Sequence, residues 1–362
     1  MLGLAGGPAE GSLDAAKWPI NGEENLERVN ILVTGGLGVN GCWVTRQLLE
    51  LGHRPIVYDT RADFSPLKDM ADRIELVVGD VLDFPRLVKT IKDYRVERVC
   101  HLAAMYPEPA DANPVRGFEV NALATVYILE AARIMGLDRV VYTSSYGALS
   151  VLGERHRYPT YAPVSEDHPA YPAHGGVYGA SKVASELMGH VYKNLYDLDF
   201  VALRFAAIFG PGKGDPRHGL MGYAWSQMVD NAMLGIPTRY ERGGDERQDM
   251  IYSRDVAHSV VLGCLAAKSS LKHQLFHVAS GRGYTLHDFA AAVNQVFPDA
   301  QIQIGPGTNP RAGIGSLYLV FDISRAQEEL GYAPRFTLPE AVADWVGWMR
   351  TLELEPRPRP TT

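Results

Sequence analysis

The chain has 362 residues, 46% of them hydrophobic, and a formal net charge of −7 at pH 7. This length and composition predict a large buried core, in one big domain or two interlocked ones. The acidic balance gives no sign of the basic surface that nucleic-acid-binding proteins carry, and no apolar run approaches the length that spans a bilayer.

The termini and the cysteines bear on localisation. Residues 1–28 lack the basic start and the long apolar centre of a signal peptide, and we expect a flexible or loosely docked N-terminal extension. Cys42, Cys100 and Cys264 show neither metal-ligand nor disulfide spacing and are expected in the core. A reducing, cytoplasmic location is therefore expected. The Pro-rich residues 353–362 are expected to form a frayed tail.

Short β-branched runs alternate with helical patterns from Asn30 onward. Helices are expected over residues 42–51, 114–136 and 178–196, and glycines end the first two. Continuous apolar strands that alternate with helices are typical of a parallel sheet covered on both faces, so the predicted fold class is α/β with a Rossmann-type doubly wound parallel sheet. The expected strands are NILVT (30–34), PIVYD (55–59), IELVVGD (74–80), VERVCHLAA (96–104), RVVYTSS (139–145) and FVALRF (200–205).

The pattern changes after Phe209, where the Gly/Pro-rich segment GPGKGDPRHG begins. Later elements are spaced less regularly, but TLHD from Thr285 and TLPE from Thr337 predict capping boxes that open two more helices. We expect a main domain over 29–208, to which 249–268 returns. A smaller C-terminal domain, over 209–248 and 269–352, is expected to pack on the carboxyl edge of the sheet.

A glycine-rich loop, TGGLGVNG, joins the first strand to the first helix. Gly35, Gly38 and Gly41 follow a strand, open a helix and lie within a βαβ unit, which is the context that dinucleotide binding requires. Without Cβ atoms the backbone can touch a pyrophosphate at the helix N-terminus, and Val39 and Asn40 lie between the glycines. The alternative is a tight turn without a ligand. We predict an NAD-binding main domain.

Acidic residues end the second and third strands. Asp59 lies roughly 20 residues after the glycine loop, where a carboxylate can accept both ribose hydroxyls and repels a 2′-phosphate. This favours NAD over NADP, although Arg61 lies near enough in the sequence to swing to a phosphate. Asp80, which precedes Val81, is expected to receive the adenine amino group. The alternative for each acid is an ordinary turn carboxylate.

Eight segments together resemble the extended short-chain dehydrogenases/reductases, also called the NAD-dependent epimerase/dehydratase family. They follow the family order from about Asn30 to Met349, so the resemblance covers most of the chain. As a set they are specific for the family and much less so for the substrate. The segments are TGGLGVNG, GDV, HLAA from His101, YTSS, YGASK, LRFAAIFGPG, DMIYSRDVA and LGYAPRFTLPEAV.

The resemblance implies a role for each of three side chains. Tyr178 looks like the acid/base, Lys182 its partner and a ligand of the nicotinamide ribose, and Ser145 the ligand of the substrate hydroxyl; Ser144 could exchange roles with Ser145. Tyr178 and Lys182 lie one helical turn apart and share a face. We expect the neighbouring ammonium and the positive nicotinamide to favour the phenolate, which can take a hydroxyl proton while hydride leaves.

Further site residues follow from the same resemblance. Asn121 lies in an apolar helix and is expected to tie that helix to the catalytic strand, the alternative being an ordinary hydrogen-bonded amide. His101 is expected in the core. The remaining residues expected at the cofactor are Leu102, Ala103, Ala104, Thr143 and Phe205.

Departures from the family pattern limit the substrate prediction. Tyr146-Gly147 follow Ser145 where sugar dehydratases carry Asp-Glu, which argues against 4,6-dehydration. An Asn typical of nucleotide-sugar enzymes is missing from residues 205–207, and Gln248-Asp249 replace the usual Arg-Asp. A smaller or differently anchored substrate is therefore expected in the smaller domain. Candidate substrate contacts are Met105, Ser144, Tyr146, His174, Arg217, His218 and Arg247; no spacing predicts a catalytic metal.

The predicted function is NAD-dependent hydride transfer at a secondary alcohol of a sugar or sugar-like molecule, by an epimerase or a dehydrogenase. The alternatives are a nucleotide-sugar epimerase, a dehydrogenase or reductase of a non-sugar alcohol or ketone, and a non-catalytic NAD-binding scaffold. Neither a nucleic acid nor a membrane is expected as a partner. By analogy with the family, a homodimer is expected through the apolar helices around residues 120–132 and 180–192.

Overall fold

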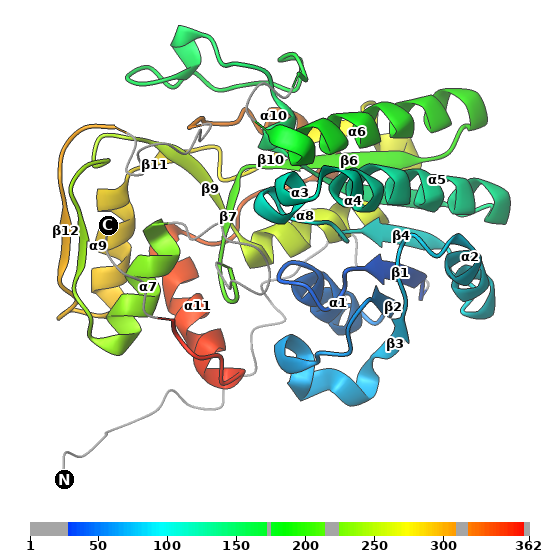
Figure 1. Cartoon of the computed structure of the whole chain (residues 1–362), viewed down its shortest axis with the longest axis horizontal. Helices are drawn as coiled ribbons and strands as arrows, with labels where there is room; N and C mark the ends of the chain where they lie inside the picture. The colour runs from blue at the N-terminus through cyan, green and yellow to red at the C-terminus, as the bar shows by residue number, and fades with distance from the viewer. Residues whose placement is uncertain (1–27, 172–174, 214–223, 309–317, 358–362) are drawn as a thin grey trace.

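A computed structural model describes residues 28–171, 175–213, 224–308 and 318–357. Its centre is a seven-stranded sheet in which every neighbouring pair of strands is parallel (Figure 1). This confirms the predicted α/β fold class. The strand order is β10-β6-β5-β4-β1-β2-β3, with β1 Asn30–Thr34, β2 Arg54–Asp59, β3 Glu75–Val78, β4 Arg98–His101, β5 Arg139–Ser145, β6 Phe200–Phe205 and β10 Leu275–Val278.

Helices cover both faces of the sheet. α1 (Gly41–Glu50) and α8 (Ser253–Leu265) share one hydrophobic cluster with one face, and α2 (Phe84–Asp93), α5 (Ala124–Met135) and α6 (Gly176–Tyr196) share another with the opposite face. Within β1, Ile31 and Val33 belong to the first cluster and Leu32 to the second. Because successive side chains of a strand point to opposite faces, a strand buried on both faces must be apolar throughout.

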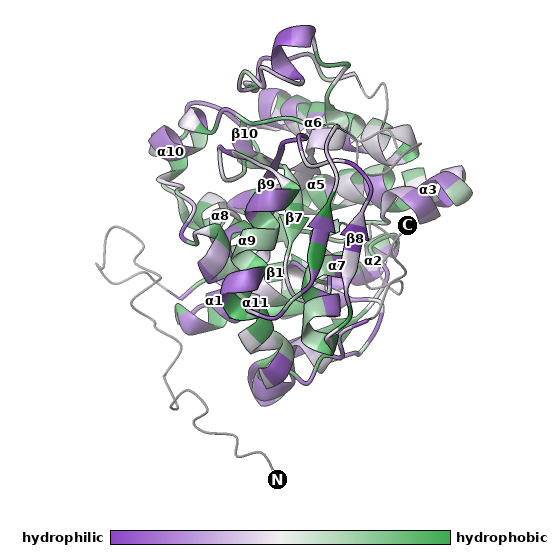
Figure 2. Cartoon of the chain, turned by 90° about the vertical axis from the view of Figure 1, so that its left-hand side faces the viewer, coloured by the Kyte–Doolittle hydropathy of each residue, from purple (hydrophilic) through white to green (hydrophobic). Residues whose placement is uncertain are grey.

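A smaller lobe packs beside the sheet around a third hydrophobic cluster. Its helices are α7 (Ala224–Leu234), α9 (Leu286–Val296) and α11 (Leu338–Thr351), and Figure 2 shows that they mix hydrophilic and hydrophobic residues. Thr285 and Thr337 form the predicted capping boxes at the starts of α9 and α11. The short strands are β7 Ala207–Phe209, β8 Thr238–Tyr240, β9 Gln248–Tyr252, β11 Gly283–Tyr284 and β12 Ile302–Ile304, ordered β11-β9-β7 and β12-β8.

Several elements differ from the sequence prediction. β10 is the edge strand of the main sheet, and α10 (Ser324–Leu330) packs on it, although both fall within the segment 269–352. The helix expected over 114–136 is divided into α4 (Pro114–Phe118), a π-helical turn (Glu119–Leu123) and α5. α2, α3 (Pro107–Ala112) and the 3₁₀ segment Ser65–Arg73 were not anticipated.

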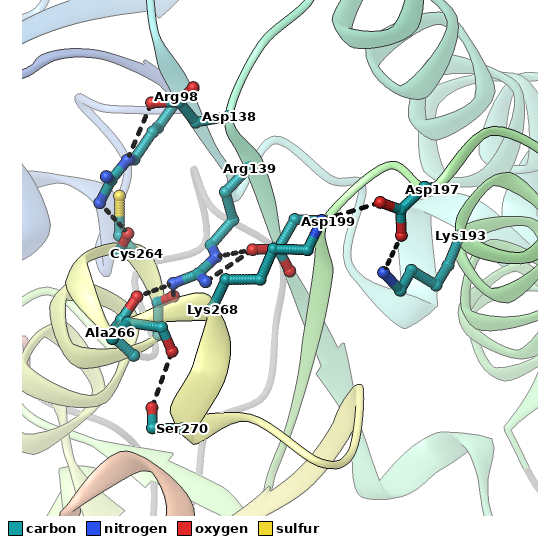
Figure 3. A network of polar contacts seen from close by, with 12 residues as sticks. Arg98, Asp138, Arg139, Lys193, Asp197, Asp199, Cys264, Ala266, Lys268 and Ser270 are labelled. Atoms are coloured by element: carbon teal, nitrogen blue, oxygen red, sulfur yellow. Dashed lines mark hydrogen bonds and ion pairs between the residues drawn. The ribbon is translucent and has the colours of Figure 1, made fainter.

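Two arginines at the starts of β4 and β5 bind the carboxyl end of α8 (Figure 3). Arg139 donates to the carbonyl oxygens of Gly263 and Ala266 at 3.0 and 2.6 Å, and it pairs with Asp199 at 2.6 Å. Arg98 donates to the carbonyl of Cys264 at 2.8 Å. The last carbonyls of a helix have no partner within the helix and carry partial negative charge, so the two guanidinium groups stabilise this helix end.

The three cysteines are buried and free, as predicted. Across the described ranges, no helix combines the length and the hydropathy that a membrane span requires.

Candidate active site

The glycine loop needs glycine because its backbone segments nearly touch. Gly35 has φ +67°, and a Cβ there would lie 2.9 Å from the backbone of Ala103. A Cβ on Gly41 would lie 2.0 Å from the carbonyl oxygen of Gly35. No side chain caps α1, and within the described chain the buried side-chain oxygen of Asn40 has no hydrogen-bond partner. A tight loop that delivers an uncapped helix start to a cavity fits the phosphates of a dinucleotide.

A cavity of about 370 Å³ extends from this loop to Tyr178 and Lys182. It passes the carboxyl ends of β1, β2, β4 and β5, where α/β proteins bind their ligands. Every residue predicted to contact the cofactor lines it. These are Gly35, Gly38, Val39, Asn40, Gly41, Asp59, Arg61, Asp80, Val81, Leu102, Ala103, Ala104, Thr143, Tyr178, Lys182 and Phe205.

The two acidic residues at strand ends, Asp59 and Asp80, have different hydrogen-bond partners. Asp59 accepts hydrogen bonds from the backbone N–H groups of Leu37 and Arg61, at 3.1 and 3.3 Å, and so helps to hold the glycine loop. Asp80 forms an ion pair with Arg116 of α4 at 2.7 Å. Partial burial opposes ionisation of Asp80, but the N–H of Leu82 and Arg116 hold the pKa of Asp80 below its usual value. Both residues line the cavity, and Asp80 does so in its ionised form.

The structure brings Ser145, Tyr178 and Lys182 together. The Ser145 hydroxyl interacts with the phenol of Tyr178 and accepts from the N–H of Gly147 at 3.1 Å. The Lys182 ammonium donates to the carbonyl of Thr143 at 2.7 Å and lies 5.3 Å from the centre of the Tyr178 ring. Strand β5 positions Ser145 and Thr143, and α6 positions the other two side chains one turn apart.

The protein groups alone do not make the phenol of Tyr178 acidic, and the predicted phenolate also requires the positive nicotinamide. Burial raises the pKa of Tyr178 above its ordinary value, and the Ser145 hydroxyl offsets this only in part. Burial also lowers the pKa of Lys182 to about 7. Desolvation disfavours the charged form of each group. The sequence shows that a charge lies near the phenol but not that both groups are buried.

Asn121 lies in the π-helical turn and holds the loop after β4. Its side chain accepts from the N–H of Met105 at 2.6 Å and donates to the carbonyl of Met105 at 3.0 Å. Its own carbonyl accepts from Ser185 of α6 at 3.1 Å, which crosslinks the two helices. The expected tie to the catalytic strand is therefore a tie to the β4 loop and to α6. A π-helical turn frees a backbone carbonyl for such a bond.

The substrate candidates divide into three groups. Met105 and Ser144 line the cavity, although the Ser144 hydroxyl donates to Glu186. Tyr146 and Arg247 are not among the residues that line it. Three candidates, His174, Arg217 and His218, lie outside the described residues.

His101 is a core residue, as expected: burial lowers its pKa to about 3, and it bonds Thr34 at 2.7 Å. Within the described segments, no three His, Cys, Asp or Glu side chains cluster as a metal site requires. The cavity is also lined by Tyr106 and by Tyr58, Arg116, Val120, Ile208 and Lys213, and the site prediction did not include these last five. Lys213 lies 5.5 Å from the ring centre of Tyr106, and no spacing in the sequence signals that pair.

Comparisons of the sequence and of the fold with known proteins agree with one another. A family model described as "NAD dependent epimerase/dehydratase family" matches residues 31–279. The chain is 32% identical to a UDP-glucose 4-epimerase of Mycolicibacterium smegmatis, over 88% of this chain and 98% of that protein. It is 29% identical to a putative UDP-glucose 4-epimerase of Methanocaldococcus jannaschii, with the same two coverages.

The fold has close counterparts among solved structures. One is the Thermus thermophilus UDP-glucose 4-epimerase in complex with NAD, with a TM-score of 0.72, 25% identity, and coverage of 89% of this chain and 99% of that one. Another is a Thermotoga maritima UDP-glucose 4-epimerase with UDP-glucose, with a TM-score of 0.73 and 22% identity over 89% and 99% of the two chains.

Proposed function

Because the chain belongs to the NAD-dependent epimerase/dehydratase family, we propose that its cavity holds NAD between the glycine loop and Tyr178. The protein is an NAD-dependent enzyme of the extended short-chain dehydrogenase/reductase type. NAD, when bound, supplies the hydride acceptor and the positive charge of its oxidised nicotinamide. The observation that carries the proposal is one continuous cavity with the glycine loop at one end and Tyr178 and Lys182 at the other.

The catalytic roles that we propose follow from the geometry. Ser145 orients the substrate hydroxyl beside the phenol of Tyr178, with which it already interacts. Tyr178 moves the hydroxyl proton, as phenolate in one direction and phenol in the other. Lys182, as an ammonium, favours the phenolate and donates to a ribose hydroxyl of the cofactor. Since burial alone raises the pKa of Tyr178, the active ionisation state depends on positive charge supplied next to it.

The substrate that we propose is a sugar or sugar-like secondary alcohol. A nucleotide-sugar epimerase is the specific second candidate, because a relative 32% identical over 98% of its length is a UDP-glucose 4-epimerase. One observation weighs against an ordinary diphosphate clamp. Gln248, at the position of the family's Arg, is buried and its amide donates to the carbonyl of Asp249 at 3.1 Å. A UDP group would therefore need different anchors here.

Replacement of Tyr178 by Phe tests the catalytic proposal. We expect turnover to fall by about 100-fold or more, because general acid–base catalysis contributes about 10²–10⁴-fold, while NAD still binds. The matched control is Y171F, since Tyr171 is exposed. UDP-glucose, UDP-galactose, free sugars and simple ketones are assayed for epimerised product and for the absorbance of reduced nicotinamide. Full turnover in Y178F would contradict the role of Tyr178.

The same enzyme is proposed to act as a homodimer in carbohydrate metabolism in the cytoplasm. Leu187, Val191 and Leu195 of α6 are exposed and spaced four residues apart, so they form a stripe on one helix face. Val115 and Phe118 on α4 add exposed apolar surface. The free, buried cysteines suit a reducing compartment. The domain boundaries stay a proposal, in which β10 and α10 belong to the main domain.

A further inference from the structure

A largely buried carboxylate, Glu186, lies one helical turn after Lys182 on α6. Its side chain is 10% exposed and pairs with Arg204 of β6 through two hydrogen bonds, at 2.8 and 2.6 Å. The same carboxylate accepts a hydrogen bond from the hydroxyl of Ser144 on β5. Ser144 and Arg204 are directly paired across β5 and β6. One side chain of α6 therefore fixes the carboxyl ends of two neighbouring strands, next to Ser145.

Tyr178, Lys182 and Glu186 share one face of α6, because they are spaced i, i+4 and i+8. This face turns toward β5 at each position that the contacts define: Lys182 bonds the Thr143 carbonyl and Glu186 bonds Ser144. Tyr178, Lys182 and the carboxyl end of β5 thus form one connected unit. A shift of Glu186 would move the parts on which the proposed chemistry depends.

The Lys182 ammonium has neutral neighbours on the other elements packed around it. On β5 it faces the Thr143 carbonyl and the ring of Tyr142, at 4.8 Å. On β4 it faces His101, whose pKa burial and the lysine charge lower to about 3. On its own helix it faces Tyr178 at 5.3 Å.

Glu186 is the negative charge that raises the pKa of Lys182 against the effect of burial. Removal of Glu186 would therefore make the lysine lose its proton at a lower pH.

We propose that Glu186 is a positioning residue for the Ser145–Tyr178–Lys182 group: it anchors the end of β5 through Ser144, and its negative charge lies one turn from Lys182 on the same helix face and favours the ammonium. This inference rests on the proposed function of the site. Glu186 does not itself line the cavity, so it acts through two residues that do: Ser144, which it bonds, and Lys182, one turn earlier on the same helix face.

The test compares E186Q, E186Q/R204M and S144A. E186Q removes the charge with little change in size but leaves Arg204 buried without its partner, so the fold of this variant is checked by circular dichroism and melting. The double variant removes both charges and avoids that penalty. S144A removes the strand link, together with one hydroxyl of the cavity lining, and leaves the charge of Glu186 in place. The control E75Q neutralises a carboxylate of an exposed ion pair at the start of β3.

Three quantities are measured from pH 6 to 10: the NAD dissociation constant, by calorimetry, and kcat and KM, by activity assay. Activity that needs the ammonium falls as pH rises through the pKa of Lys182. We expect E186Q and E186Q/R204M to shift this alkaline limb to lower pH by about half a unit or more, in binding as well as in kcat. S144A should lower kcat without shifting the limb, and E75Q should change neither.

Two failures are distinguishable. Wild-type protein that binds no NAD would overturn the proposed function itself. Wild-type protein that binds NAD and turns over substrate, with an alkaline limb that stays in place in the folded double variant, would overturn only the role of Glu186.

Discussion

Replacement of Gly41 by Ala should abolish tight NAD binding without unfolding the protein. The new methyl group would lie 2.0 Å from the carbonyl oxygen of Gly35, which falls 1.4 Å short of the 3.4 Å at which ordinary contact begins. It would also meet Gly36 Cα at 2.7 Å. Both obstacles are backbone atoms, so no side chain can swing aside and the loop itself must move.

The size of the effect follows from the hydrogen bonds at stake. The N–H of Gly38 donates to the carbonyl of Gly35 at 2.9 Å, and the N–H of Cys42 donates to that of Gly38 at 2.9 Å. A shift of more than 1 Å breaks such bonds. It also misaligns the N–H groups that face a pyrophosphate, and hydrogen bonds to charged groups contribute about 1.5–3 kcal/mol each. We expect the NAD dissociation constant to rise about 100-fold, or roughly 2.8 kcal/mol.

Calorimetric titration with NAD, together with thermal melting, measures the outcome. The matched control is G153A, because Gly153 has φ −64° and a Cβ there meets nothing within 4 Å. The control should bind NAD like wild type. NAD affinity in G41A within about threefold of wild type, less than 1 kcal/mol, would refute the close-approach explanation of the loop.

Two further predictions concern stability and assembly. R139M should lower the free energy of unfolding in urea by about 3–5 kcal/mol, because it leaves the largely buried carboxylate of Asp199 without its ion-pair partner. R54M, in an exposed pair, should cost less than about 1 kcal/mol, and equal losses would contradict the capping role of Arg139. L187E/L195E should convert a dimer to a monomer in sedimentation while L234E, on α7, does not, and an unchanged mass in the double variant would exclude an α6 interface.

The sheet and the cofactor half of the cavity could be predicted because their signals are local. The glycine loop, Asp59 and Asp80 each follow a recognisable strand, and parallel strands bring their carboxyl ends to one edge. The far end of the cavity is built differently. Tyr106 and Lys213 come from separate loops that meet only in the folded chain, so no spacing reveals them.

Burial and local helix geometry also escaped the sequence. The pKa of Tyr178 depends on how completely the phenol is removed from water, which only the packed structure determines. The π-helical turn at Asn121 has an ordinary helical sequence, and its extra residue per turn is stabilised by bonds to Met105 and Ser185 from elsewhere in the fold.

Strand β10 lies far along the sequence from the other strands of its sheet, and this affects both the synthesis of the protein and its truncation. A nascent chain that has emerged as far as Phe205 contains six of the seven sheet strands, yet the edge of β6 stays open until Leu275–Val278 are synthesised. An unpaired strand edge is a template for association with other chains. We therefore expect a fragment cut after β6 to aggregate, so truncation should not yield a free-standing nucleotide-binding half.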